Sequence, residues 1–512
     1  MPSQFPPLNI PPVPSRDSRF YGSSGSPQLN FWDRFRGKGR PHVGWTESAI
    51  AIARSSWLNV LLVIVPVAWA LHFVNGISHI VQFIFCFIAI IPLCRLLDYG
   101  GENLALYCGK DFGDVIVVSA NNAVEATLAI CLLSTCQLRL LQATIVGTVL
   151  LRLVFVPSMH FISGGARIAA QDLHPHLADL NQTLLTTGVL SLLLPAAFFS
   201  ALNSVDAGGE SPNAVSDSVR GDLLKVSRGL AVLLLAVYLC SRIFLHNPPG
   251  SENGLHEHKD APAEFKERAA RMAEEDPEVN PWACLILLFL VVALMAPTAE
   301  FLVESIQPMS ERHQIPQEFF GLILLPFVSY SAECILSLVY HVQLHLEHYL
   351  GTPLYPPKTL AEARSIELSI QFLIFWMPLL VLLAWVTNKP LSLLFDLFEV
   401  VLLLSVGFLV NYVTADAKTN WIEGVQLLAL YAMMALTAWF YPGQPAVQTM
   451  LSCGSIQSFL AAEGVPPNST FTNISFEGFH ATLDDSQINN FTDRLRDLNK
   501  LYSLLKQIET GS

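Results

Sequence analysis

Long apolar runs separated by short polar turns fill the chain from residue 57 to residue 441. A helix that crosses the hydrocarbon core of a bilayer needs about 20 mainly apolar residues. Because such runs recur, we predict an all-α, polytopic membrane protein with about eleven transmembrane helices. The expected spans lie at residues 57–75, 79–97, 114–135, 141–162, 181–202, 229–246, 281–303, 317–342, 366–387, 390–412 and 421–441.

Polar segments divide the chain into five parts. Residues 1–56 form a basic tail rich in Pro, Ser and Gly, which we expect to be disordered in the cytosol. Residues 57–246 and 281–441 are the two predicted transmembrane halves. Residues 247–280 carry a cluster of acidic residues and predict a cytosolic loop helix, which is either a solvated face or a cation-attracting, regulatory element. Residues 442–512 form a polar C-terminal tail.

The predicted halves share a pattern. Each contains a polar helix with a glutamate, followed by a second helix with polar residues on an apolar background. Such correspondence is typical of transporters built on repeats, whose site lies near the bilayer midplane where the halves meet. We expect one extra N-terminal helix and then two five-helix repeats, the second inverted because an odd number of spans flips its entry side.

Charge and sequons predict the orientation. Arg54 and the basic tail precede the first helix, whereas the turn at 72–79 has no Lys or Arg, so we place the N-terminus in the cytosol. An odd number of spans then puts the C-terminal tail in the lumen. The tail holds three glycosylation candidates, which need lumenal exposure to be used: Asn468, Asn473 and Asn490.

Composition excludes several classes of protein. The chain has 512 residues, of which 52% are hydrophobic and 14% are charged, against about 25% charged in soluble domains. The net charge of −13 argues against a nucleic-acid partner. No nucleophile constellation, phosphate loop or cofactor motif stands out, so we expect neither an enzyme nor a cofactor. The nine cysteines show no metal-ligand spacing, and we expect neither a zinc site nor a disulfide framework.

Two of the glutamates in the predicted spans lie within short polar motifs, one in each half. A carboxylate at bilayer depth costs about 2.5–3.5 kcal/mol and persists mainly where it faces a polar pathway. Glu125 lies three residues after Asn122, on the same helix face. Glu333 follows Ser331 in the second half. The alternative for each glutamate is a helix-end residue that reaches to the interface.

The ligand chemistry favours a hard cation. Carboxylate, amide and hydroxyl oxygens are what calcium-like ions bind, whereas zinc and copper favour thiolate and imidazole. The next helix of the second half adds Ser369 and Gln371. Burial raises the pKa of a glutamate, so that it can take a proton as a metal leaves. We therefore predict one cation site in which Glu125 and Glu333 alternate between metal and proton.

Ten short motifs along the chain match those of a known family in type and in order. They lie at residues 102–106, 121–125, 141–147, 163–165, 192–198, 299–305, 321–326, 369–371, 390–393 and 420–424. Over residues 57–441 the chain resembles the cation/proton exchangers of the calcium/cation antiporter superfamily, specifically the fungal vacuolar calcium/proton exchangers. The resemblance implies eleven helices, an acidic helix between the sixth and seventh, and export of cytosolic calcium into the vacuole in exchange for protons.

The resemblance also implies ion ligands. The two family motifs read Gly-Asn-Ala-x-Glu, with the glutamates as core ligands. Glu125 and Glu333 match those glutamates, and Asn122 matches the first asparagine. Ser369 and Gln371 match polar positions that follow the second motif.

Substitutions within these motifs are expected to modify the site. Asn121 and Ser329 replace the motif glycines, which would narrow the backbone approach to an ion. Tyr330 replaces the second asparagine, and Cys334 replaces the histidine after the second glutamate.

Two further departures concern charge. Arg152 stands where the family has an asparagine one turn after Gly147, and we expect it to pair with Glu125 and hold the charge that a metal would bring. Glu367 replaces a glycine in the second half and is expected to form an ion pair with Arg152.

The leading hypothesis is an antiporter that exchanges protons for calcium across an intracellular membrane, loads the vacuole and so serves calcium homeostasis. One alternative is a degenerate paralogue that acts in regulation or interaction. Another is a changed ion such as sodium, potassium or manganese. The expected partners are calcium, protons and membrane lipid, and assembly as a homo-oligomer is left open.

Overall fold

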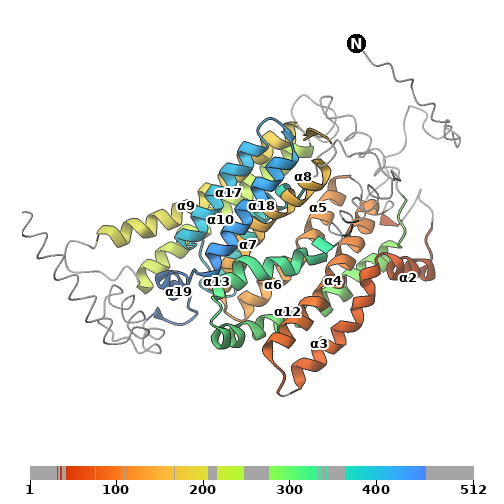
Figure 1. Cartoon of the computed structure of the whole chain (residues 1–512), viewed down its shortest axis with the longest axis horizontal. Coiled ribbons are helices and arrows are strands. Elements are labelled where there is room, and N and C mark those ends of the chain that lie inside the picture. The colour runs from red at the N-terminus through yellow and green to blue at the C-terminus, as the bar shows by residue number, and fades with distance from the viewer. Residues whose placement is uncertain are drawn as a thin grey trace, which may run out of the picture.

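The computed structural model describes residues 32, 35–36, 42–74, 76–108, 110–165, 168–173, 175–205, 216–246, 276–332, 334–335, 339, 342 and 364–456. These residues are mostly helical (Figure 1). Residues 247–275 of the predicted acidic loop helix, most of both tails, Glu333 and the three sequons lie outside them. Residues 276–280, the end of that predicted helix, are described and are not helical. The first half contains α2 (Trp45–Arg54), the 3₁₀-helix η1 (Trp57–Val63), α3 (Ile64–Phe73), α4 (His79–Cys108), α5 (Lys110–Asn121), α6 (Ala123–Ser134), α7 (Leu138–Leu150), the π-helix η2 (Leu151–Phe155), α8 (Val156–Gly165), α9 (Pro175–Val205) and α10 (Asp217–His246).

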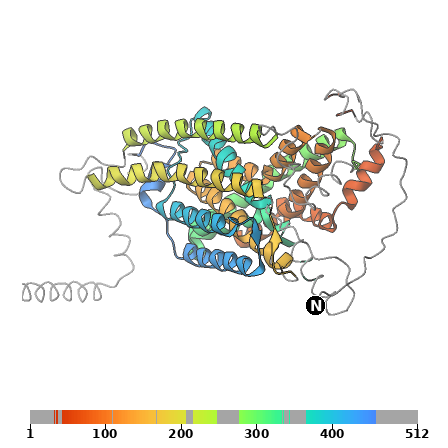
Figure 2. The same cartoon turned by 90° about the horizontal axis from the view of Figure 1, so that it is seen from above.

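The second half is also mostly helical. It contains α12 (Pro281–His313), α13 (Gln317–Phe319), the π-helix η5 (Phe320–Leu324), α15 (Arg364–Gln371), the π-helix η6 (Phe372–Trp376), α16 (Met377–Val386), α17 (Leu397–Val413), α18 (Trp421–Trp439) and α19 (Pro445–Met450). Figure 2 shows α10, α9 and α17 lying side by side. Strands β1 (Gln171–Asp172) and β2 (Lys418–Thr419) pair antiparallel and join a loop of each half.

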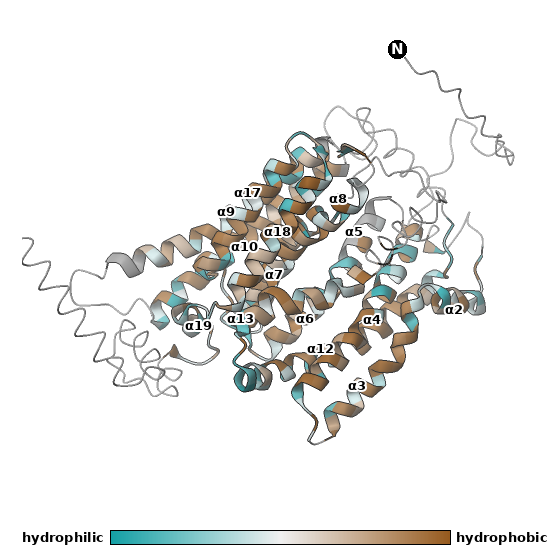
Figure 3. Cartoon of the chain, in the orientation of Figure 1, coloured by the Kyte–Doolittle hydropathy of each residue, from teal (hydrophilic) through white to brown (hydrophobic). Residues whose placement is uncertain are grey.

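The apolar surface identifies a multi-pass membrane protein. Seven described helices are long and apolar enough to cross a bilayer, or eight if the bent pair of α2 with η1 and α3 counts as one span. Large apolar side chains such as Phe289 and Phe408 are exposed. Figure 3 shows that most of the helices are rich in hydrophobic residues. Such a surface is unfavourable in water and is typical of a membrane protein. The total of eleven spans stays a prediction, because α6 and α17 are shorter and the stretch after residue 332 is described only in part.

Several helix boundaries differ from the prediction. Helix α4 runs to Cys108 and not only to residue 97, so its last turns are polar and still helical. Helices α9 and α10 also begin earlier than the apolar runs do. Hydropathy marks only the lipid-crossing part of a helix, whereas backbone hydrogen bonds continue beyond it. Helix α17 begins later than expected, at Leu397, because the Asp396 side chain accepts from the Phe398 amide at 3.0 Å and caps the helix.

The two halves meet where α7 crosses η5. A Cβ built at Gly321 would clash with the Cβ of Ala143, so the helices touch through their backbones. The π-helices η2 and η6 occupy corresponding places, since each interrupts the helix that follows a polar motif helix. Wide turns of this kind occur often at functional sites. The correspondence agrees with the predicted repeat.

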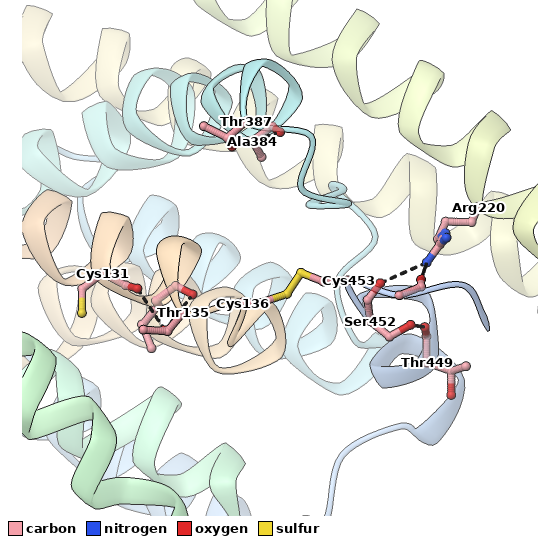
Figure 4. Close-up of a disulfide and its surroundings, with 11 residues drawn as sticks. Cys131, Thr135, Cys136, Arg220, Ala384, Thr387, Thr449, Ser452 and Cys453 are labelled. Atoms are coloured by element: carbon pink, nitrogen blue, oxygen red, sulfur yellow. Dashed lines mark hydrogen bonds between the residues drawn. A yellow bond between two sulfur atoms is a disulfide. The ribbon is translucent and has the colours of Figure 1, made fainter. Parts of the chain in front are cut away.

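A disulfide corrects the sequence-based expectation. Cys136, in the turn between α6 and α7, is bonded to Cys453, which follows α19 (Figure 4). Arg220 of α10 donates to the main-chain oxygens of Ser452 at 3.0 Å and Gly454 at 2.9 Å, on the same segment. The cysteines are 317 residues apart, and sequence spacing carries no signal for a pair that only the fold brings together.

Candidate functional site

The third predicted span is broken in the middle of the first motif. Helix α5 ends at Asn121 and α6 begins at Ala123, with Asn122 as the N-cap residue at φ −105°. Asparagine side chains compete for backbone hydrogen bonds and so disfavour a continuous helix. Non-helical backbone at membrane depth is tolerated only where protein or a polar cavity satisfies it. The break therefore marks a polar position inside the bundle.

Glu125 lies in the first turn of α6, beside this break. Its side chain is 3% exposed, and Asn122 is fully buried. The amide groups at a helix N-terminus favour a negative charge there. Asn122 and Glu125 thus lie together, buried at the N-terminus of α6.

Arg152 from η2 binds the whole of this motif. Its Nη1 donates to the side-chain oxygen of Asn122, and its Nη2 donates to the carboxylate of Glu125 and, at 2.9 Å, to the main-chain oxygen of Asn121. The guanidinium also lies 5.7 Å from the ring centre of Tyr330. The expected pairing of Arg152 with Glu125 is therefore confirmed.

Asn121 contributes its side chain as well as its carbonyl. With the amide oriented so that both of its groups are satisfied, it accepts from Arg364 Nη2 at 3.0 Å and donates to Val117. Arg364 opens α15, which packs against η2. The residue that replaces the first motif glycine thus links the two halves.

The remaining predicted ion-binding residues that the structure describes are buried polar groups of the second half. Ser331 donates to the Val328 carbonyl at 2.7 Å, and Ser369 donates to the Ser365 carbonyl at 2.9 Å. Gln371, also buried, donates to Glu367 at 3.4 Å. Each hydroxyl is therefore turned toward its own helix.

The described residues include only part of the predicted site. Glu333 lies outside the described residues, so its approach to Glu125 stays a prediction. Cys334 is half-buried. Within the described ranges, no group of three or more His, Cys, Asp or Glu side chains has metal-binding geometry.

The expectation for Glu367 was wrong. Its carboxylate accepts from Arg242 of α10 at 3.3 Å, whereas Arg152 pairs with Glu125. Both Arg242 and Glu367 are partly exposed, with 13% and 26% of their side chains accessible. Helix α10 thus supplies a nearer cation than η2, which the sequence could not reveal.

A second charged centre escaped the sequence reasoning. The buried Arg139 of α7 contacts Glu318 at 2.9 Å, and Asp396 and Glu399 at 3.1 Å each. Tyr441 donates to Asp396 at 2.7 Å. The signal was present, because each charged residue stands at the start of an apolar run, where an ionisable group needs a partner. This centre ties α7, α13 and α17 together near one end of the bundle.

Comparison with known proteins identifies relatives named as ion transporters and exchangers. The family described as sodium/calcium exchanger protein matches residues 283–440. A vacuolar calcium ion transporter of Cryptococcus neoformans var. grubii is 31% identical, over 81% of this chain and 78% of its own length. That of Schizosaccharomyces pombe is also 31% identical, over 78% and 88%. A Ca²⁺/H⁺ antiporter of Synechocystis is 29% identical, over 76% and 98%.

Solved structures share the fold. The structure of native YfkE superposes with a TM-score of 0.55 and 20% identity, over 75% of this chain and all of that one. The H⁺/Ca²⁺ exchanger CAX gives 0.51 and 14% identity, over 87% and 98%. At this identity the likeness concerns the arrangement of helices alone.

Proposed function

Because the chain belongs to the cation/proton exchanger family of the calcium/cation antiporter superfamily, we propose that it is a secondary active antiporter exchanging protons for calcium. The observation that carries this proposal is the buried Glu125 beside the helix break at Asn122. A carboxylate in that position serves ion chemistry more readily than packing. The relatives reported above are transporters or antiporters, so they favour transport over a purely regulatory role.

The exchange follows from the chemistry of one carboxylate. Glu125 in its ionised form attracts a cation, and in its protonated form it is neutral and releases that cation. The side-chain oxygen of Asn122 and the main-chain oxygen of Asn121 lie beside it, and both suit a hard cation. Glu333 would complete the site from the second half. Calcium and protons then compete for the same oxygens, which couples their opposite movements.

The proposed location is the vacuole, with calcium moving from the cytosol into the lumen. Two observations support a lumenal position for the end of the chain. The disulfide between Cys136 and Cys453 places both residues on one side of the membrane, and disulfides persist in oxidising compartments rather than in the cytosol. The sequons at residues 468, 473 and 490 point to the same side. The basic N-terminus would then be cytosolic.

We further propose that the chain is not an enzyme, needs no cofactor, binds no nucleic acid and contacts membrane lipid. Assembly as a homo-oligomer is left open.

The test is calcium uptake into proteoliposomes that hold the purified full-length protein and an acidic interior. We expect uptake that stops when the pH gradient is dissipated. Glu125→Gln and Glu333→Gln should each reduce it to background. The matched control is Glu304→Gln on α12, a carboxylate with 49% of its side chain exposed, which should transport normally. Absence of uptake by well-folded protein, or uptake unaffected by both substitutions, would exclude calcium/proton exchange. Competition with sodium, potassium and manganese identifies the preferred ion.

A further inference from the structure

The Arg152 guanidinium occupies the point on which the oxygens of the first motif converge. It binds the Asn122 amide oxygen, the Asn121 main-chain oxygen and the Glu125 carboxylate. These are the three kinds of oxygen that a hard divalent cation takes as ligands in proteins. Arg152 thus uses the same atoms that a bound calcium ion would need at this motif.

The guanidinium of Arg152 is a fixed positive charge beside Glu125. The side chains of Arg152 and Glu125 are 2% and 3% exposed, so water screens their interaction little. A metal ion arriving beside the guanidinium would meet an unscreened like charge. The ion and Arg152 therefore compete for one carboxylate.

Tyr330 holds the guanidinium from the second half. Its ring centre lies 5.7 Å from Arg152 Cζ, within the range of a cation–π interaction. The Tyr330 side chain is almost fully buried, which strengthens such a contact. The two departures at residues 152 and 330 therefore act together, one supplying a cation and the other stabilising it.

We propose that Arg152 is a specificity-determining residue that acts as a tethered cation. It competes with the transported metal ion for Glu125 and so gives the site a weak affinity for divalent cations. The ion binds as the guanidinium leaves the carboxylate. This inference rests on the proposed function, because it takes Glu125 as an ion ligand.

The test measures calcium binding directly, apart from transport. The melting temperature of the purified full-length protein in detergent is followed as calcium is added, since an ion that binds the folded state stabilises it. Arg152→Gln removes the charge and keeps an amide, and should lower the half-saturating calcium concentration at least about tenfold. Glu125→Gln in the same background should abolish this gain.

Arg242→Gln is the matched control, because Arg242 also pairs with a partly buried glutamate but lies on α10. It should leave the half-saturating concentration unchanged. Should Arg152→Gln not fold, Tyr330→Leu decides, because it leaves the charges balanced. Loss of the ring loosens the guanidinium, so calcium should bind about threefold more tightly.

An Arg152→Gln protein that binds calcium no better than the unaltered protein would overturn the inference, as would a Tyr330→Leu protein without tighter binding. Failure of the proposed function looks different. If Arg152→Gln binds calcium tightly through Glu125 but no variant exchanges it for protons, the tethered cation stands and the antiport does not. If the unaltered protein transports and the binding is unchanged by Arg152→Gln, antiport stands and the tethered cation does not.

Discussion

Gly147 of α7 lies so close to Gly321 of η5 that a Cβ on residue 147 would lie 2.7 Å from the main-chain oxygen of Gly321. A real Cβ does not approach a backbone atom so closely. The two transmembrane halves are therefore in direct backbone contact at this crossing, only a few residues before Arg152.

We predict that Gly147→Ala destabilises the protein, because the oxygen belongs to the backbone and cannot rotate away. Overpacking of this kind costs about 1–3 kcal/mol. The control is Gly229→Ala on α10, where a Cβ would meet nothing within 4 Å. That substitution should be neutral or stabilising by up to about 1 kcal/mol, since alanine favours a helix. Thermal unfolding in detergent compares the two variants. Equal melting temperatures would contradict the close backbone contact between α7 and η5.

Arg139→Met should be strongly destabilising. It leaves Glu318, Asp396 and Glu399 buried without their cation. Breaking a buried ion pair from one side costs about 3–5 kcal/mol. Glu399→Gln added to Arg139→Met should recover part of the loss, because it removes one uncompensated charge.

The control for this cluster is Lys225→Met. Lys225 pairs with Asp222 at 2.9 Å, but both side chains are more than half exposed, so the melting temperature should not change. A similar loss from both substitutions, or no recovery in the double variant, would show that charge is not what Arg139 contributes.

Cys136→Ser and Cys453→Ser should each lower stability, by about 2–4 kcal/mol if the bond acts by restricting the unfolded chain. The double variant should lose no more than either single one, because both remove the same bond. Cys240→Ser, at an exposed free cysteine, is the control. Mass spectrometry of the non-reduced protein should find the linked peptides, and reduction should release them.

Endoglycosidase treatment tests the orientation. If the C-terminal tail is lumenal, treatment of protein from a eukaryotic host should increase its electrophoretic mobility. Replacing Asn468, Asn473 and Asn490 by Gln should remove the change. If antibodies reach a C-terminal epitope tag from the cytosolic side of intact vacuoles, the proposed lumenal position of the C-terminus is wrong.

The sequence alone was sufficient for the class of fold and for half of the site. Apolar runs of spanning length and a low content of charge predict a helical membrane protein, because lipid requires every backbone group to be satisfied within the helix. Asn122 and Glu125 could be paired because three residues along a helix bring side chains to one face. Arg152 could be predicted as the counter-charge of Glu125, because a buried carboxylate needs a positive partner.

The tertiary structure decided which charges meet. Glu367 binds Arg242 instead of Arg152, and Arg139 gathers carboxylates from residues 318, 396 and 399. Such pairs join segments more than a hundred residues apart, and neither helical periodicity nor hydropathy reports which faces of two helices are packed together. The same holds for Cys136 and Cys453. Local patterns follow from the chain's own geometry, whereas these long-range contacts follow only from the packing of one half against the other.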